Sequence, residues 1–185
     1  MTQLILASES KRRVDILKML GFEFLVLPSR VEESSEGQPM LVARRLAFKK
    51  AFTVWKEYKF ATVLGADTLV VLGDRMLVKP KSREEAMFML KSLSGKWHRV
   101  VTGVCILSPA GRLCFHDTAR VKFRVLSGKE IEEYAITDEP MDKAGAYAVQ
   151  GMGARFVERI VGDFYTVMGL PASKTYEALN KFLKL

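Results

Sequence analysis

Two long runs of strand-forming residues lie next to each other in the middle of the chain, at residues 97–107 and 113–125. The turn Pro109-Ala110-Gly111 joins them, so together they predict a long antiparallel hairpin. On either side of it, short apolar runs typical of buried strands alternate with segments of helical periodicity. A purely parallel, doubly wound sheet has no place for such a hairpin. The pattern therefore predicts an α/β fold with a mixed sheet and flanking helices.

The other elements follow from periodicity, capping residues and turn residues. We expect further strands over 4–7, 22–28, 61–66 and 155–162, a hairpin over 68–78, and helices over 11–20, 40–58, 82–93, 128–136 and 171–183. A chain of 185 residues with 49% apolar residues is long enough to bury a core of its own. We expect one domain over residues 1–185, with room for two lobes.

The N-terminal stretch "MTQLILASES" has only a short apolar run before its charged residues. It is typical of neither a signal peptide nor a membrane span, so we expect a cytoplasmic protein with no membrane partner. Cys105 and Cys114 lie on either side of the hairpin turn, which leaves a pair across two strands open. In a reducing compartment, however, we expect two buried free thiols.

Three adjacent cations, Lys11, Arg12 and Arg13, stand at the start of the first predicted helix. They repel one another and oppose the helix dipole, so they form either a solvated surface turn, as charge runs usually do, or a site for an anion in front of them. The formal net charge of +8 also favours anionic partners. The basic residues are scattered and are not interleaved with aromatic residues, so we expect a small polyphosphate rather than a nucleic acid.

Asp67, in "GADT", is the strongest catalytic candidate because it follows a buried strand, where α/β proteins place ligands. A carboxylate there can bind Mg²⁺ or accept a proton from water, although it can also simply turn the chain. Glu33, in a loop after Pro28, is either a second carboxylate for the same ion or a solvated loop acid. Pro80 keeps Lys79 out of the helical region, so this lysine can project toward a ligand.

The stretch "DKAGAYAVQG" from Asp142 to Gly151 combines glycines, small residues and one aromatic residue. Its backbone can approach a ligand closely, and the amide of Gln150 has the donor and acceptors that suit the edge of a nucleobase. A connector with Tyr147 buried in the core explains the same composition. The residues alone favour that second interpretation.

In this order, the motifs resemble the Maf family of nucleoside triphosphate pyrophosphatases. The resemblance covers essentially the whole chain, and its motifs are "SESKRR" at 8–13, "RLAFKKA" at 45–51, "GADT" at 65–68, "KP" at 79–80, "LSGKWHRVVTG" at 93–103, "DEPMDKAGAYAVQG" at 138–151 and "GLP" at 169–171. Two positions depart from the family pattern. Lys11 replaces a proline, and Val78 stands where the family usually has glycine or glutamate, but neither change removes a proposed catalytic group.

The resemblance implies hydrolysis of a nucleoside triphosphate to the monophosphate and pyrophosphate with a divalent metal cation, Mg²⁺ or Mn²⁺. It also implies a strongly curved mixed sheet with two lobes around a cleft, as in inosine triphosphate pyrophosphatases, and a homodimer. The form of "DKAGAYAVQG" resembles the branch that acts on dTTP and UTP, including modified pyrimidine nucleotides, and so cleans the nucleotide pool. Three alternatives stay open: the same reaction on other nucleotides such as 7-methyl-GTP, a regulator of septum formation, and a nucleic-acid-binding module.

The resemblance and the chemistry of the residues together imply roles within the site. Asp67 accepts the proton of the attacking water and holds metal together with Glu33. Gln150 reads the uracil or thymine edge, and Arg12 and Thr68 share with it the positions linked to substrate choice. The complete set of expected substrate-binding residues is Ser8, Ser10, Arg12, Arg13, Lys50, Thr68, Lys79 and Gln150.

Overall fold

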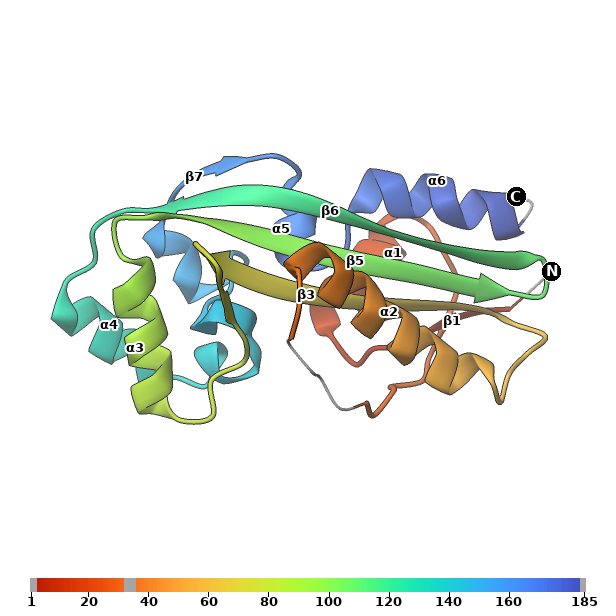
Figure 1. Cartoon of the computed structure of the whole chain (residues 1–185), viewed down its shortest axis with the longest axis horizontal. Helices are drawn as coiled ribbons and strands as arrows, with labels where there is room; N and C mark the ends of the chain where they lie inside the picture. The colour runs from red at the N-terminus through yellow and green to blue at the C-terminus, as the bar shows by residue number, and fades with distance from the viewer. Residues whose placement is uncertain (1–2, 32–35, 184–185) are drawn as a thin grey trace. The chain divides into compact units, whose positions relative to one another are not determined.

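The computed structural model describes residues 3–31 and 36–183, and its strands form one mixed sheet (Figure 1). The strand order is β2-β1-β3-β5-β6-β7, with β4 paired to β3. β1 pairs in parallel with β2 and β3, whereas the pairs β3–β4 and β6–β7 are antiparallel. The strands are β1 (Leu4–Leu6), β2 (Leu25–Val26), β3 (Thr62–Leu72), β4 (Arg75–Leu77), β5 (Trp97–Ser108), β6 (Gly111–Phe123) and β7 (Val157–Val161). The predicted mixed sheet is confirmed.

The expected helices are present in the expected order, together with one further short helix at Phe164–Met168. They are α1 (Lys11–Met19), α2 (Pro39–Trp55), α3 (Arg83–Leu93), α4 (Gly128–Ala135), α5 (Phe164–Met168) and α6 (Ala172–Leu183), and three short 3-10 turns are η1 (Glu139–Asp142), η2 (Ala144–Ala146) and η3 (Met152–Phe156). Ser127 begins α4 with the reciprocal hydrogen bonds of a capping box. Within the described residues, no helix is long and apolar enough to cross a membrane.

The chain divides into two compact units that share the long strands. Unit 1 consists of Met1–Asp67, Thr102–Asp117 and Gly169–Leu185, and unit 2 consists of Thr68–Val101 and Thr118–Met168. The boundary within β3 falls directly after Asp67, so β3, β5 and β6 each contribute residues to both units.

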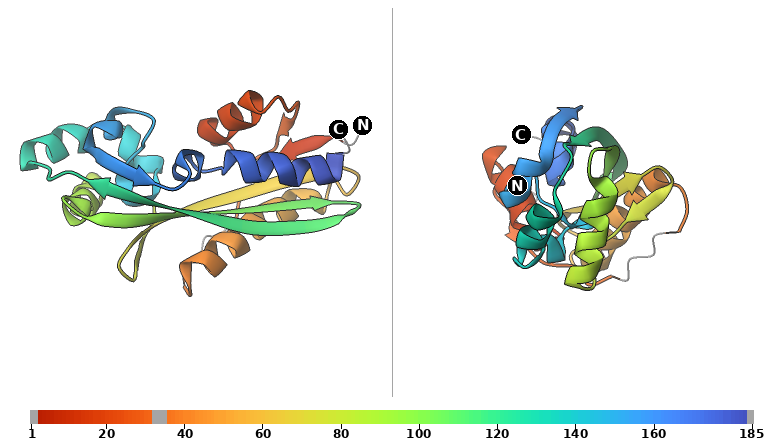
Figure 2. Two further views of the ribbon diagram at one scale, coloured as in Figure 1. Left: turned by 90° about the horizontal axis from the view of Figure 1, so that it is seen from above. Right: turned by 90° about the vertical axis from the view of Figure 1, so that its left-hand side faces the viewer.

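In unit 1, α2 covers one face of the sheet, and α1 and α6 cover the other (Figure 2). The sheet-facing side of α2 carries small residues four apart, Ala43, Ala47 and Ala51, which are fully buried. Opposite them are two glycines. A Cβ at Gly65 would lie 2.5 Å from the backbone nitrogen of Ala51, and a Cβ at Gly103 would lie 2.6 Å from that of Arg44. The backbone of α2 therefore rests directly on the backbones of β3 and β5.

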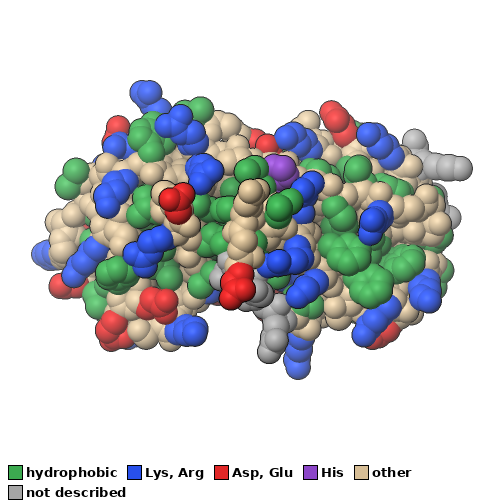
Figure 3. Space-filling view, viewed as in Figure 1, with side chains coloured by type: hydrophobic (Ala, Val, Ile, Leu, Met, Phe, Trp, Pro, Cys, Tyr) green, Lys and Arg blue, Asp and Glu red, His purple; other side chains and the backbone are tan. Residues whose placement is uncertain are grey.

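The basic residues do not form a single strip on the face drawn in Figure 3. Lys and Arg side chains are spread over this face and alternate with acidic, polar and apolar groups. On this face, the distribution agrees with the scattered charges of the sequence.

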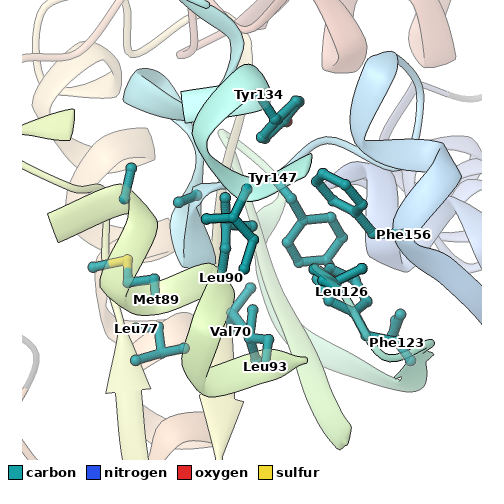
Figure 4. Close-up of a cluster of buried hydrophobic side chains, with 14 of the residues drawn as sticks. Val70, Leu77, Met89, Leu90, Leu93, Phe123, Leu126, Tyr134, Tyr147 and Phe156 are labelled. Atoms are coloured by element: carbon teal, nitrogen blue, oxygen red, sulfur yellow. The ribbon is translucent and has the colours of Figure 1, made fainter. Parts of the chain in front are cut away.

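Unit 2 has its own core, built around aromatic residues (Figure 4). Tyr147 is buried there, as the connector interpretation expected, and its ring packs edge-on against Phe123 at 4.7 Å between centroids. His98 lies beside both rings, with Nε2 2.8 Å from the Tyr147 hydroxyl oxygen. Its Nδ1 has no hydrogen-bond partner among the residues that the structure describes. Burial lowers the pKa of His98 to about 4, so this histidine is neutral near pH 7.

The structure corrects two expectations. β3 continues without interruption from residue 62 to residue 72, so Asp67 lies within a strand rather than just past its end. Cys105 and Cys114 form a disulfide, so the expectation of two free thiols is wrong. The reason is the hairpin of β5 and β6, which brings their Cα atoms to 4.1 Å, close to the spacing of directly opposite residues in a non-hydrogen-bonded antiparallel pair.

The neutral His98 makes the stability of the protein depend on pH. Since its folded pKa of about 4 lies below the unfolded value of about 6.5, the unfolded state binds more protons in that interval, and stability falls on acidification. We expect this residue to account for about 2 kcal/mol of the loss between pH 7 and pH 4.5. Urea unfolding of His98→Gln should therefore show a shallower fall over that interval than the wild type.

His116 provides the matched control, because it is half-buried and its pKa is lowered by partial burial and by the nearby Arg44 and Lys174. We expect the stability of His116→Gln to fall between pH 7 and pH 4.5 nearly as much as that of the wild type. An acid loss in His98→Gln equal to that of the wild type would contradict the assignment.

Candidate active site

A buried ion pair joins α2 to β3 in unit 1. Lys50 Nζ lies 2.5 Å from Asp67 Oδ1, and the side chains are only 12% and 6% exposed, respectively. Two opposite charges held in a place with little water compensate each other, and removing one of them leaves an uncompensated buried charge. The site thus holds a carboxylate and an ammonium group next to one another.

The glycine contacts determine where this pair forms. Gly65 lies two residues before Asp67 on β3 and accepts the close approach of Ala47 and Ala51, which flank Lys50 on α2. A larger residue at position 65 would push the helix outward. The distance between Lys50 and Asp67 is therefore a consequence of the missing side chain at Gly65.

The N-terminal turn of unit 1 is held by Arg13. Its Nη1 donates to Ser8 Oγ at 3.0 Å, and its Nε donates to the carbonyl oxygen of Gly169 at 2.9 Å. The backbone N–H of Ser10 also donates to Ser8 Oγ, at 3.3 Å. Ser10 stands at the N-cap of α1 but makes no side-chain cap bond there. The first turn of α1 contains no acidic residue and begins with Lys11 and Arg12.

Unit 2 brings together two motifs that are far apart in the sequence. The backbone N–H of Gly145 donates to the carbonyl oxygen of Val78 at 3.3 Å, which joins "VKP" to "DKAGAYAVQG". The unusual Val78 contributes only its main chain to this bond. Lys79 and Gln150 are both exposed, and Thr68 is half-buried.

The predicted residues thus fall into three groups. Unit 1 joins Lys50 to Asp67 and, separately, Arg13 to Ser8, while Ser10 and Arg12 lie on the same turn as Arg13. Thr68, Lys79 and Gln150 belong to unit 2. Glu33 lies outside the described residues.

The sequence interpretation did not single out Glu139 or the role of Gly65. Glu139 stands in the motif "DEPMDKAGAYAVQG". Its carboxylate binds residues more than ten positions further along the chain, so no local sequence pattern indicates its role. For Gly65, the spacing of alanines in "ARRLAFKKA" is a readable signal of a helix that packs closely.

The donor set fits a divalent cation only together with a bound polyphosphate. Mg²⁺ typically takes one or two carboxylates and completes its shell with water and phosphate oxygens. Asp67 provides one carboxylate, and no three His, Cys, Asp or Glu side chains gather into a cluster within residues 3–31 and 36–183. The described residues therefore do not form a metal site from protein ligands alone.

Comparison with known proteins shows the family of this chain. The family described as Maf-like protein matches residues 3–182. The chain belongs to the Maf family. The dTTP/UTP pyrophosphatase of Aquifex aeolicus (strain VF5) is 56% identical over 180 residues, which are 97% of this chain and 95% of that protein. The protein of the same name from Geobacillus sp. (strain WCH70) is 46% identical over 98% of both chains.

Solved structures share the fold of this Maf chain. The Staphylococcus aureus Ham1 protein superposes with a TM-score of 0.56 at 14% identity, covering 97% of this chain and 99% of that one. A HAM1 protein from Coxiella burnetii gives a TM-score of 0.53 at 13% identity, covering 100% and 99%. At such identities the likeness concerns the fold alone, and it confirms the predicted fold class over nearly the full length.

The close approach of α2 to β3 predicts a sharp effect of one methyl group. We expect Gly65→Ala to lower the free energy of unfolding by about 2 kcal/mol or more, because helix backbone rather than a flexible side chain occupies the space. Since the helix must move, we also expect Lys50 to leave Asp67. Urea unfolding and a crystal structure of the variant measure both effects.

Gly128→Ala is the matched control, because nothing lies within 4 Å of a Cβ at that position. We expect it to change stability by less than about 0.5 kcal/mol. Equal stability of the two variants would show that α2 does not depend on Gly65.

Proposed function

We propose that this chain hydrolyses dTTP and UTP, including modified pyrimidine nucleotides, to the monophosphate and pyrophosphate. The observation that carries the proposal is the buried pair of Lys50 and Asp67, in a Maf chain that is 56% identical to a protein named dTTP/UTP pyrophosphatase. In this proposal residues 1–185 act as a single catalytic domain that removes unwanted nucleotides from the cellular pool.

The first requirement of the reaction is to offset the charge of the triphosphate, which carries about four negative charges near neutral pH. We assign this task to the cations of the α1 turn together with Lys50 and Lys79. Arg12 presents a planar fork that can bind two phosphate oxygens at once, and the N-terminus of α1 favours the same anion. Arg13 spends two of its donors on Ser8 and Gly169, so its part is to hold the turn in shape with Ser8 and Ser10 beside the phosphates.

The second requirement is a base for the attacking water. The water oxygen forms a bond to the α-phosphorus, the bond from that phosphorus to the bridging oxygen of pyrophosphate breaks, and the proton passes to Asp67. Lys50 carries three N–H donors, so it can hold Asp67 with one and donate to a phosphate oxygen with another. Thr68, the next residue along β3, contributes a hydroxyl to substrate binding, and Gln150 reads the pyrimidine edge.

A divalent cation, Mg²⁺ or Mn²⁺, would be held by Asp67, Glu33 and the phosphates and would supply further charge compensation. We place the enzyme in the cytoplasm, where its substrates are, and expect the homodimer of the family. Light scattering of the purified protein measures whether it is a dimer.

Removal of the base should lower turnover strongly. Because it also removes the buried counter-charge of Lys50, urea unfolding must first show that the variant is folded. We expect Asp67→Asn to lower kcat/KM for dTTP by about 100-fold or more, the usual contribution of a general base. Asp74→Asn is the control, since Asp74 is an exposed residue of the turn between β3 and β4, and it should keep wild-type activity. Pyrophosphate release is the readout, and wild-type release by Asp67→Asn would exclude Asp67 as the base.

A panel of nucleotides assayed side by side tests the substrate class. With Mg²⁺ or Mn²⁺ present, we expect dTTP and UTP to be turned over faster than dATP, dGTP, dCTP and 7-methyl-GTP. If a purine nucleotide is turned over faster than both dTTP and UTP, the proposed substrate is wrong, while the proposed reaction still holds.

A further inference from the structure

The segment that carries Gln150 has no regular structure of its own between η2 and η3. A single carboxylate holds its far end. Glu139 Oε2 accepts the backbone N–H of Met152 at 3.0 Å, and Glu139 Oε1 accepts that of Gly153 at 2.9 Å. Two N–H groups that follow Gln150 almost directly are therefore fixed to the same side chain.

Tyr134 extends this hold to the near end of the segment. Its hydroxyl donates to Glu139 Oε1 at 2.8 Å and accepts the backbone N–H of Ala148 at 3.3 Å. Tyr134 is fully buried in the core of unit 2, where its ring packs edge-on against Phe156 at 4.9 Å (Figure 4). The hydrogen bonds from Tyr134 and Glu139 thus bracket Gln150 on both sides and tie it to the core.

Gly151 shows how closely the segment passes over the carboxylate. A Cβ at this position would lie 2.8 Å from Glu139 Cδ, closer than real Cβ atoms come. Burial disfavours the charged form of Glu139, but the N–H groups of Gly153 and Met152 and the Tyr134 hydroxyl outweigh it and keep the pKa of Glu139 below its usual range. The acceptor is therefore a carboxylate at neutral pH, which makes these hydrogen bonds charge-assisted.

An exposed glutamine on an unsupported segment can rotate and pair with either pyrimidine, because its amide carries both donors and acceptors. To discriminate between bases, the site must leave hydrogen-bonding groups unpaired when the wrong base binds. This requires that the side-chain amide of Gln150 be held in one orientation. We propose that Glu139 is a positioning residue for base recognition: with Tyr134 it fixes the segment 148–153 so that Gln150 accepts thymine or uracil and rejects cytosine. This inference rests on the proposed role of Gln150.

The test is a double-mutant cycle on the ratio of kcat/KM for dTTP to that for dCTP. We expect Glu139→Ala to lower this ratio by about tenfold, and to change it no further in a Gln150→Ala background, because both variants remove the same discrimination. Gly151→Ala should lower the ratio to the same extent, because its new methyl group displaces the Glu139 carboxylate without removing it. This second variant covers the case in which Glu139→Ala fails to fold.

Glu130→Ala is the control for a merely structural role. Glu130 also holds a network in unit 2, with Ser127 at the start of α4 and with Arg124, but it does not contact the segment of Gln150. We expect this variant to lose stability and to keep the wild-type ratio. Hydrogen exchange should become faster at Ala148, Met152 and Gly153 in Glu139→Ala and stay slow there in Glu130→Ala.

An active Glu139→Ala enzyme with the wild-type ratio would overturn the inference and leave the proposed function intact. The inference also fails if the effect of Glu139→Ala adds fully to that of Gln150→Ala, or if Gln150→Ala keeps the wild-type ratio. A wild-type protein that releases no pyrophosphate from any nucleotide would instead overturn the proposed function, and the inference with it.

Discussion

The close contact between the backbone of α2 and the backbones of β3 and β5 is the constraint on which unit 1 depends. Gly65 and Gly103 have no side chains to separate them from the alanine stripe of α2, so helix and sheet approach to backbone contact. This approach brings Lys50 within 2.5 Å of Asp67 in a nearly dry environment. The geometry of this pair is therefore a product of main-chain packing.

Electrostatics then separates the tasks within the molecule. In unit 1, an ion pair compensates itself, while the α1 turn keeps cations with no acidic residue in its first turn. The first arrangement suits a base that must stay ionised, and the second suits a polyanionic ligand. In unit 2, Glu139 binds main-chain N–H groups instead of a cation, so its charge is used to order a segment of chain. The Lys50–Asp67 pair, the α1 turn and Glu139 thus differ in composition and suit different tasks.

The sequence predicted the mixed sheet and most element positions because caps, turns and periodicity are local. For example, α4 begins at Gly128 as its periodicity predicted, and the hairpin of β5 and β6 lies where its turn predicted. The motifs also led to Lys50 and Asp67, although their direct pairing could not be read from residues 17 positions apart. What failed depended on the exact pairing of the strands. Asp67 lies within a strand because pairing with β4 continues β3 beyond it, and Cys105 meets Cys114 because hairpin register sets their spacing.

The central claim is that Asp67 directs a water molecule at the α-phosphorus of a pyrimidine nucleoside triphosphate. The most direct test is a single turnover of dTTP in water enriched in heavy oxygen, followed by mass spectrometry of both products. Attack at the α-phosphorus predicts that the label appears in the monophosphate and is absent from pyrophosphate. Label in the pyrophosphate instead would mean that water attacks the β-phosphorus, and it would contradict the account.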